Sequence, residues 1–167
     1  MANTFIKIGT VTVGSGGASS ISFTSIPSTY TDLCLKVSSR VDAGAEYSAN
    51  VIRFNGSTSN LFCNYFFGNG VNLQSSTDTV IYTWANGSTS TSNTFGNMEI
   101  YIPNYTNSNN KSVGIDIVTE NNNTTSIAAC VSGLWSNTSA INQVTILPTA
   151  GSYVQYSTAT LYGISKS

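Results

Sequence analysis

The chain has 167 residues and a mass of 17.6 kDa, and six Lys and Arg against seven Asp and Glu leave a formal net charge of −1. Charged residues are 8% of the sequence, against about 25% in an average soluble domain. This scarcity excludes long charged helices, coiled coils and the basic surface that nucleic-acid binding requires. Because the sequence has no histidine, histidine triads and histidine metal sites are also impossible.

The length and the 40% hydrophobic content indicate one domain, residues 1–167, with a real core. No apolar run approaches the ~20 residues of a membrane-spanning helix. The N-terminus lacks the basic and apolar segments of a secretory signal, so we expect synthesis in a cytoplasm and no membrane partner.

Apolar and polar residues alternate along most of the chain, which is typical of β-strands with one buried face. Asn- and Gly-containing turns, such as Asn55-Gly56 and Asn86-Gly87, separate the alternating runs. We therefore predict an all-β protein, an antiparallel β-sandwich or jelly roll of roughly ten strands. Strands are expected within residues 5–13, 20–23, 33–38, 50–55, 61–67, 79–84, 98–102, 113–117, 125–135, 141–147 and 153–164.

Two segments between the predicted strands have their own character. Residues 14–20 form a Gly-rich loop, which would allow residues 1–13 to act as an N-terminal arm or an edge strand. Residues 87–93, GSTSTSN, are the least complex segment and are expected to form an exposed loop.

The reactive side chains give weak signals for catalysis. Cys34, Cys63 and Cys130 form no C-x-x-C pair, and without a histidine base we expect reduced, buried cysteines. Two carboxylate pairs could serve glycoside hydrolysis or Ca²⁺ binding, but we interpret them as solvated or locally paired charges. They are Asp42 with Glu46 and Asp116 with Glu120. No enzymatic activity, metal or cofactor is predicted.

Aromatic residues make up 11% of the chain. Trp84, Tyr101 and Trp135 lie in predicted strands, where core packing is the ordinary role. If exposed, they could stack on sugar faces or anchor a protein partner. The set is large for one small core, which suggests an interface between subunits.

The final strand reads S-T-A-T-L-Y-G-I from Ser157 to Ile164, and Ile6–Gly14 reads I-K-I-G-T-V-T-V-G. Residues 21–33 follow with a strand, a Pro27 turn and Tyr-Thr-Asp-Leu. This pattern resembles small structural proteins of tailed bacteriophages, and the terminal motif is its most specific part. The resemblance implies a virion protein assembled in the host cytoplasm: a capsid decoration (cement) protein, a head fibre or a tail-fibre tip, often a trimeric jelly roll.

Two functions remain open. The first is a capsid decoration protein, a homotrimer on the capsid exterior that binds the major capsid protein and stabilises the assembled shell. Its candidate contact residues are Phe5, Ile6 and Ile8, with Trp84, Tyr101 and Trp135. The alternative is a fibre tip that binds host surface glycan through those last three aromatic residues. Under either function, we expect Lys7, Arg40, Arg53 and Glu99 to form pairs at subunit contacts.

Overall fold

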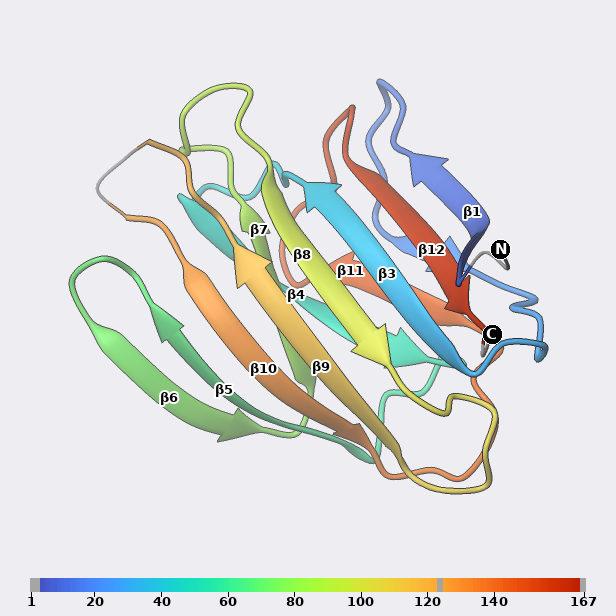
Figure 1. Ribbon diagram of the computed structural model, residues 1–167. Coiled ribbons are helices and arrows are strands. Elements are labelled where there is room, and N and C mark those ends of the chain that lie inside the picture. The colour runs from blue at the N-terminus through green and yellow to red at the C-terminus, as the bar shows by residue number, and fades with distance from the viewer. Residues whose placement is uncertain (1–3, 123–124, 166–167) are drawn as a thin grey trace.

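The computed structural model describes residues 4–122 and 125–165, which form twelve β-strands in two antiparallel sheets (Figure 1). The larger sheet has the strand order β1-β12-β3-β8-β9-β10-β5-β6. Its strands are β1 (Phe5–Thr12), β12 (Thr158–Ile164), β3 (Asp32–Ser39), β8 (Gly96–Ile102), β9 (Lys111–Val118), β10 (Ala128–Trp135), β5 (Leu61–Gly68) and β6 (Leu73–Asp78). The smaller sheet has the order β2-β11-β4-β7, with β2 (Ile21–Phe23), β11 (Val144–Pro148), β4 (Tyr47–Phe54) and β7 (Ile81–Asn86).

The core lies between the two sheets and follows from the alternation in the sequence. In β8, β9 and β10 every second side chain is buried, and the residues between them point away from the smaller sheet. The inward rows include Leu33, Ile100, Ile115 and Val131, all in one hydrophobic cluster. The described residues contain no helix that could cross a membrane.

The prediction of an all-β antiparallel sandwich is confirmed, with twelve strands in place of roughly ten. The strand that sequence reasoning missed is β6, whose residues other than Leu73 are polar and which is almost entirely exposed. Its sequence, LQSSTD, carries no alternating apolar signal, because neither of its faces is fully buried. The narrower assignment as a jelly roll stays a prediction.

The two Asn-Gly pairs turn out to have different roles. Asn55 and Gly56 have φ values of 51° and 71° and form the predicted tight turn after β4. The turn predicted at Asn86-Gly87 begins one residue later, because Asn86 ends β7 and is fully buried, and the Ser90 amide donates to the carbonyl oxygen of Gly87. Gly87 is needed there for close approach, since a Cβ atom would lie 2.0 Å from the carbonyl oxygen of Ala45.

The edges of the larger sheet are β1 and β6. β1 pairs with β12 along its length, with a register shift between Lys7 and Gly9. Of the two predicted alternatives for this segment, an arm or an edge strand, the structure shows the edge strand. Two backbone hydrogen bonds between Ala18 and Tyr153 also fasten the Gly-rich loop after β1. β1 is therefore already part of its own sheet. Residues 1–3 of the predicted arm lie outside the described residues.

The motifs behind the phage resemblance meet in space. A Cβ atom on Gly163, in the closing strand, would lie 2.3 Å from the ring of Tyr30. Next to it, the amide and hydroxyl of Thr31 both donate to the carbonyl oxygen of Ile164, at 2.9 and 2.7 Å. Asp32 accepts hydrogen bonds from the Asn104 amide and the Tyr101 hydroxyl. These motif residues fasten the chain end to β3.

Candidate interaction face

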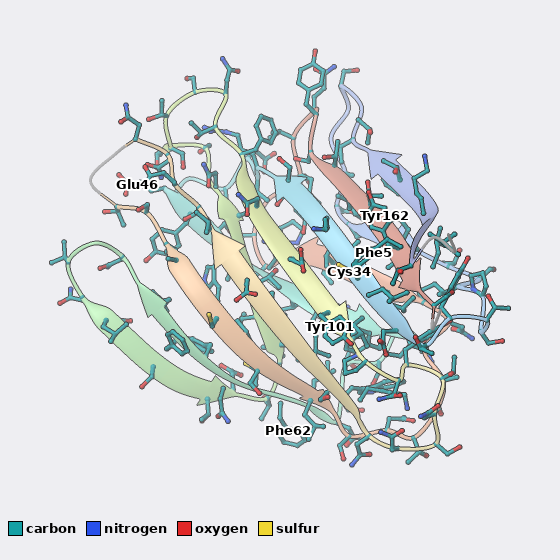
Figure 2. The ribbon with its side chains drawn as sticks, viewed as in Figure 1. Phe5, Cys34, Glu46, Phe62, Tyr101 and Tyr162 are labelled. Carbon is teal, nitrogen blue, oxygen red and sulfur yellow. The ribbon has the colours of Figure 1, made fainter. Side chains whose placement is uncertain are left out.

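The larger sheet turns one whole side away from the smaller sheet, and we call this side the outer face. Its residues follow from the register, because partners across antiparallel strands lie on the same side. One row runs Tyr162, Cys34, Tyr101, Gly114, Ser132 and Asn64 across β12, β3, β8, β9, β10 and β5. Figure 2 looks onto this face, with Phe5, Tyr162, Cys34 and Tyr101 on one side of it and Phe62 at its lower end.

Large apolar side chains concentrate on the outer face. Ten large hydrophobic or aromatic side chains are exposed among the described residues, and the register places seven of them here. The seven are Phe5, Phe62, Phe66, Leu73, Tyr101, Val118 and Leu134. Single exposed apolar residues are ordinary, but a concentration on one sheet face is typical of an interaction surface.

The aromatic patch consists of Phe5, Tyr162 and Tyr101, with Cys34 between the two tyrosines in register. The rings of Phe5 and Tyr162 meet edge to face at 6.1 Å between centroids. Cys34 is 1% exposed although it lies on the outer face, because these neighbours flank it. Burial raises the pKa of its thiol, and Glu99 adds to the effect, so Cys34 is a protonated packing residue and not a nucleophile.

The second patch consists of Phe62, Phe66 and Leu134 on β5 and β10. Phe62 and Leu134 are directly paired across the strands, and Phe66 is 54% exposed. Between this patch and the aromatic patch lies Gly114, whose Cβ position has no atom within 4 Å. Gly114 therefore adds no side chain to this part of the face.

Three of the charged residues on the outer face lie in one row, and Lys7 and Asp32 lie on the same face near Tyr162 and Phe5. Lys36 and Glu99 form an ion pair at 2.7 Å, with both side chains about half exposed. The next residue in register, Asp116, accepts a hydrogen bond from the Cys130 thiol at 3.3 Å. An exposed ion pair of this kind contributes at most about 1 kcal/mol to stability. We therefore expect this row to orient a bound partner more than to strengthen its binding.

The structure separates the six predicted contact residues. Phe5 and Tyr101 are exposed on the outer face, whereas Ile6 is 38% exposed at the β1 edge and Ile8 is partly buried beside the core. Neither tryptophan is exposed on the outer face, and of these two described residues only Trp84 lines a pocket. Trp135 is 2% exposed and packs against Phe54, and Trp84 is 6% exposed beneath other rings. Both occupy ordinary strand positions at which apolar neighbours cover them.

Arg40 forms its hydrogen bonds within its own chain, although the sequence predicted it at a subunit contact. Its guanidinium donates to four backbone carbonyl oxygens of the 87–94 loop, at 2.8 to 3.0 Å. Asn86, directly before this loop, and Ser90, in its middle, are buried. The prediction of an exposed loop at residues 87–93 is confirmed except at Gly87 and Ser90, which are buried, and the loop is ordered around the Arg40 guanidinium.

The carboxylates act as local hydrogen-bond acceptors. Asp42 accepts from the Ser152 amide at 2.7 Å. Glu120 accepts from the amides of Asn121 and Asn122, and the Asn122 bond is the main cause of its lowered pKa. In the described ranges, no group of three Cys, Asp or Glu side chains is placed to hold a metal ion.

Cys34 and Cys63 are buried, as predicted, but Cys130 is exposed, so that prediction is wrong for one of the three. Cys130 lies on the outer face beside Asp116, whose hydrogen bond and charge, together with burial, raise the pKa of the thiol. All three thiols are free.

The fold and this face define an antiparallel β-sandwich with one broad, uncovered sheet surface. No protein-family model matches the chain, and a search of curated proteins finds no significant relative.

Proposed function

We propose that this chain is a non-catalytic virion protein that decorates a phage head by docking its outer face on the assembled shell. The observation that carries the proposal is the concentration of seven exposed apolar side chains on the outer face. Burying them against a shell would contribute hydrophobic free energy in proportion to area. The virion context is supported by the sequence resemblance, and the partner is the major capsid protein.

Docking through the outer face suits this role better than strand donation by residues 1–13. Phe5–Thr12 already pairs with β12, so donating it would cost the hydrogen bonds of that pairing. Binding the assembled shell through the sheet face leaves the fold intact. Shell binding would then stabilise the assembled state by mass action, without a cofactor.

The test uses head shells purified from phage lacking this chain. Purified protein should cosediment with the shells up to a fixed ratio to capsid subunits. The Phe62→Ser, Phe66→Ser double variant should bind at least about tenfold more weakly, because both exposed rings are lost. Tyr156→Asn is the matched control, since Tyr156 is 68% exposed in a loop outside the outer face. Equal binding by the double variant and wild type would contradict the proposal.

The second candidate is a fibre tip that binds glycan. The specific observation in its favour is that partly exposed aromatic rings surround Trp84. Protein quantification in purified virions separates the two functions. Copies comparable in number to capsid subunits support decoration, and a few copies per particle support a fibre.

A further inference from the structure

The β5–β6 hairpin has a second side, opposite the outer face. On this side the hairpin and β7 form a pocket. Tyr65 and Phe67 of β5 face Tyr82 and Trp84 of β7, and all four line this pocket. In register, Gln74 of β6 pairs with Phe67, so it lies on the same side of the hairpin. This arrangement is separate from the docking face, because alternate residues of a strand point to opposite sides.

Aromatic rings form the floor and walls of the pocket. Trp84 is the floor, with ring centroids at 5.3 Å from Tyr65, 5.7 Å from Phe67 and 6.1 Å from Tyr82. Tyr65 and Phe67 are nearly parallel, with an angle of 22° between their planes. Trp84 is buried, but Tyr65, Phe67 and Tyr82 are only partly buried. Ring surface therefore remains open to a ligand.

Polar groups at the rim remain available for hydrogen bonds. Asp78 uses one carboxylate oxygen, Oδ1, to accept from the Thr79 amide at 2.7 Å. Within residues 4–122 and 125–165, its other oxygen, the Gln74 amide and the hydroxyls of Tyr65 and Tyr82 have no hydrogen-bond partner. Burial, with a smaller effect from Asp78, raises the pKa of Tyr82, so its hydroxyl keeps its proton at neutral pH.

We infer that this pocket binds a neutral sugar ring. A pyranose presents C–H groups on one side, which aromatic faces attract, and hydroxyls at its edge, which carboxylate and amide groups bind. Asp78 is the one charged residue among those lining the pocket, so an acidic sugar would meet a like charge. The inference does not depend on the proposed shell docking, and it holds for a decoration protein or a fibre tip.

The obvious competing occupant is a proline-rich peptide, since such peptides also dock in aromatic grooves. The sugar is favoured because Gln74 and Asp78 offer donors and acceptors together beside the rings. A sugar edge can use all of them, whereas a proline ring has no N–H to donate.

Saturation-transfer NMR on the full chain tests the inference with glucose, galactose, mannose and N-acetylglucosamine, each at about 10 mM, a concentration that detects millimolar affinity. Glucuronic acid and a proline-rich peptide are included as competitors. We expect transfer to the C–H protons of at least one neutral sugar and much weaker transfer to glucuronic acid. A signal only from the peptide, or from none of the sugars, would overturn the inference.

Single variants on β6 and β7 sharpen the test. Gln74→Ala should weaken binding of the responding sugar by about tenfold, and Asp78→Asn should increase the signal from glucuronic acid. Ser75→Ala is the matched control, because Ser75 lies next to Gln74 but on the opposite side of the hairpin. Tyr82→Phe removes only a hydroxyl and checks the pocket without opening the fold. Unchanged sugar binding in Gln74→Ala and Tyr82→Phe would place the sugar elsewhere and overturn the inference.

Discussion

Tyr153 shows how a single residue can serve packing at the expense of hydrogen bonding. Its side chain is fully buried, and its hydroxyl has no hydrogen-bond partner among the described residues. Burial strongly raises the pKa of this hydroxyl. Its backbone meanwhile exchanges hydrogen bonds with Ala18 and ties down the loop after β1. The ring and backbone therefore have clear structural roles, and the hydroxyl has none.

We expect Tyr153→Phe to stabilise the fold by about 1 kcal/mol at neutral pH, because it removes a buried hydroxyl without a partner. The difference should grow in alkali. The folded state keeps the Tyr153 proton above the ordinary pKa of 10.0, so stability from this proton is complete below that pH and is lost as pH rises further. Urea unfolding at neutral and alkaline pH measures both effects. A destabilised variant would mean that the hydroxyl has a partner.

At the scale of elements, two glycines in strands have opposite surroundings. Gly163 in β12 lies under the Tyr30 ring, whereas Gly114 in β9 faces open space on the outer face. From the sequence alone, either glycine is expected to weaken its strand, since glycine has no side chain to pack. Only the packing of Tyr30 explains why the closing strand needs glycine at this position.

Gly163→Ala should therefore destabilise the domain by about 1–3 kcal/mol, because the added methyl group displaces the Tyr30 ring. Gly114→Ala is the matched control and should stay within about 0.5 kcal/mol of wild type. Thermal unfolding of the two variants makes the comparison. Equal melting temperatures would show that Tyr30 moves aside at no cost.

Strands with one buried face could be predicted from the sequence, whereas the strand without a buried face could not. β8 and β9 were located because their alternation repeats over the whole strand. β6 was missed because it is held by pairing with β5 and buries little. Trp84 was correctly placed in a strand, but its cover comes from Tyr65 and Phe67, about twenty positions away in the chain. Local patterns cannot show such a contact.

At the scale of the whole molecule, the few charges serve mostly the chain itself. Arg40 holds a loop, Lys36 pairs with Glu99, and buried Lys111 donates to the carbonyl oxygen of Asn107. The expectation that scarce charges pair between subunits is thus replaced, for Arg40 and Glu99, by pairing within the chain. A partner of the outer face would meet its seven exposed large apolar side chains, set among neutral Ser, Thr and Asn residues.

Binding through the outer face should consequently depend little on salt. We expect the affinity for head shells to change less than about threefold between about 0.05 and 0.5 M NaCl, because screening acts on charges and not on apolar burial. Cosedimentation across this range measures the dependence. A steep loss of binding with salt would point to a charged contact, contrary to the proposed apolar docking.

The sequence by itself determined the all-β class, most strand positions, the antiparallel sandwich and the absence of histidine chemistry. These follow from composition and period-two alternation, which depend on residues near one another in the chain. The tertiary structure alone decided which face stays uncovered, which aromatics are buried and where a pocket forms. Each of these depends on strands far apart in sequence, and the register between them brings Phe62 beside Leu134 and Tyr65 over Trp84. Sparse charge excludes several classes of function from the sequence alone, and the fold gathers most of the exposed large apolar side chains on one sheet face.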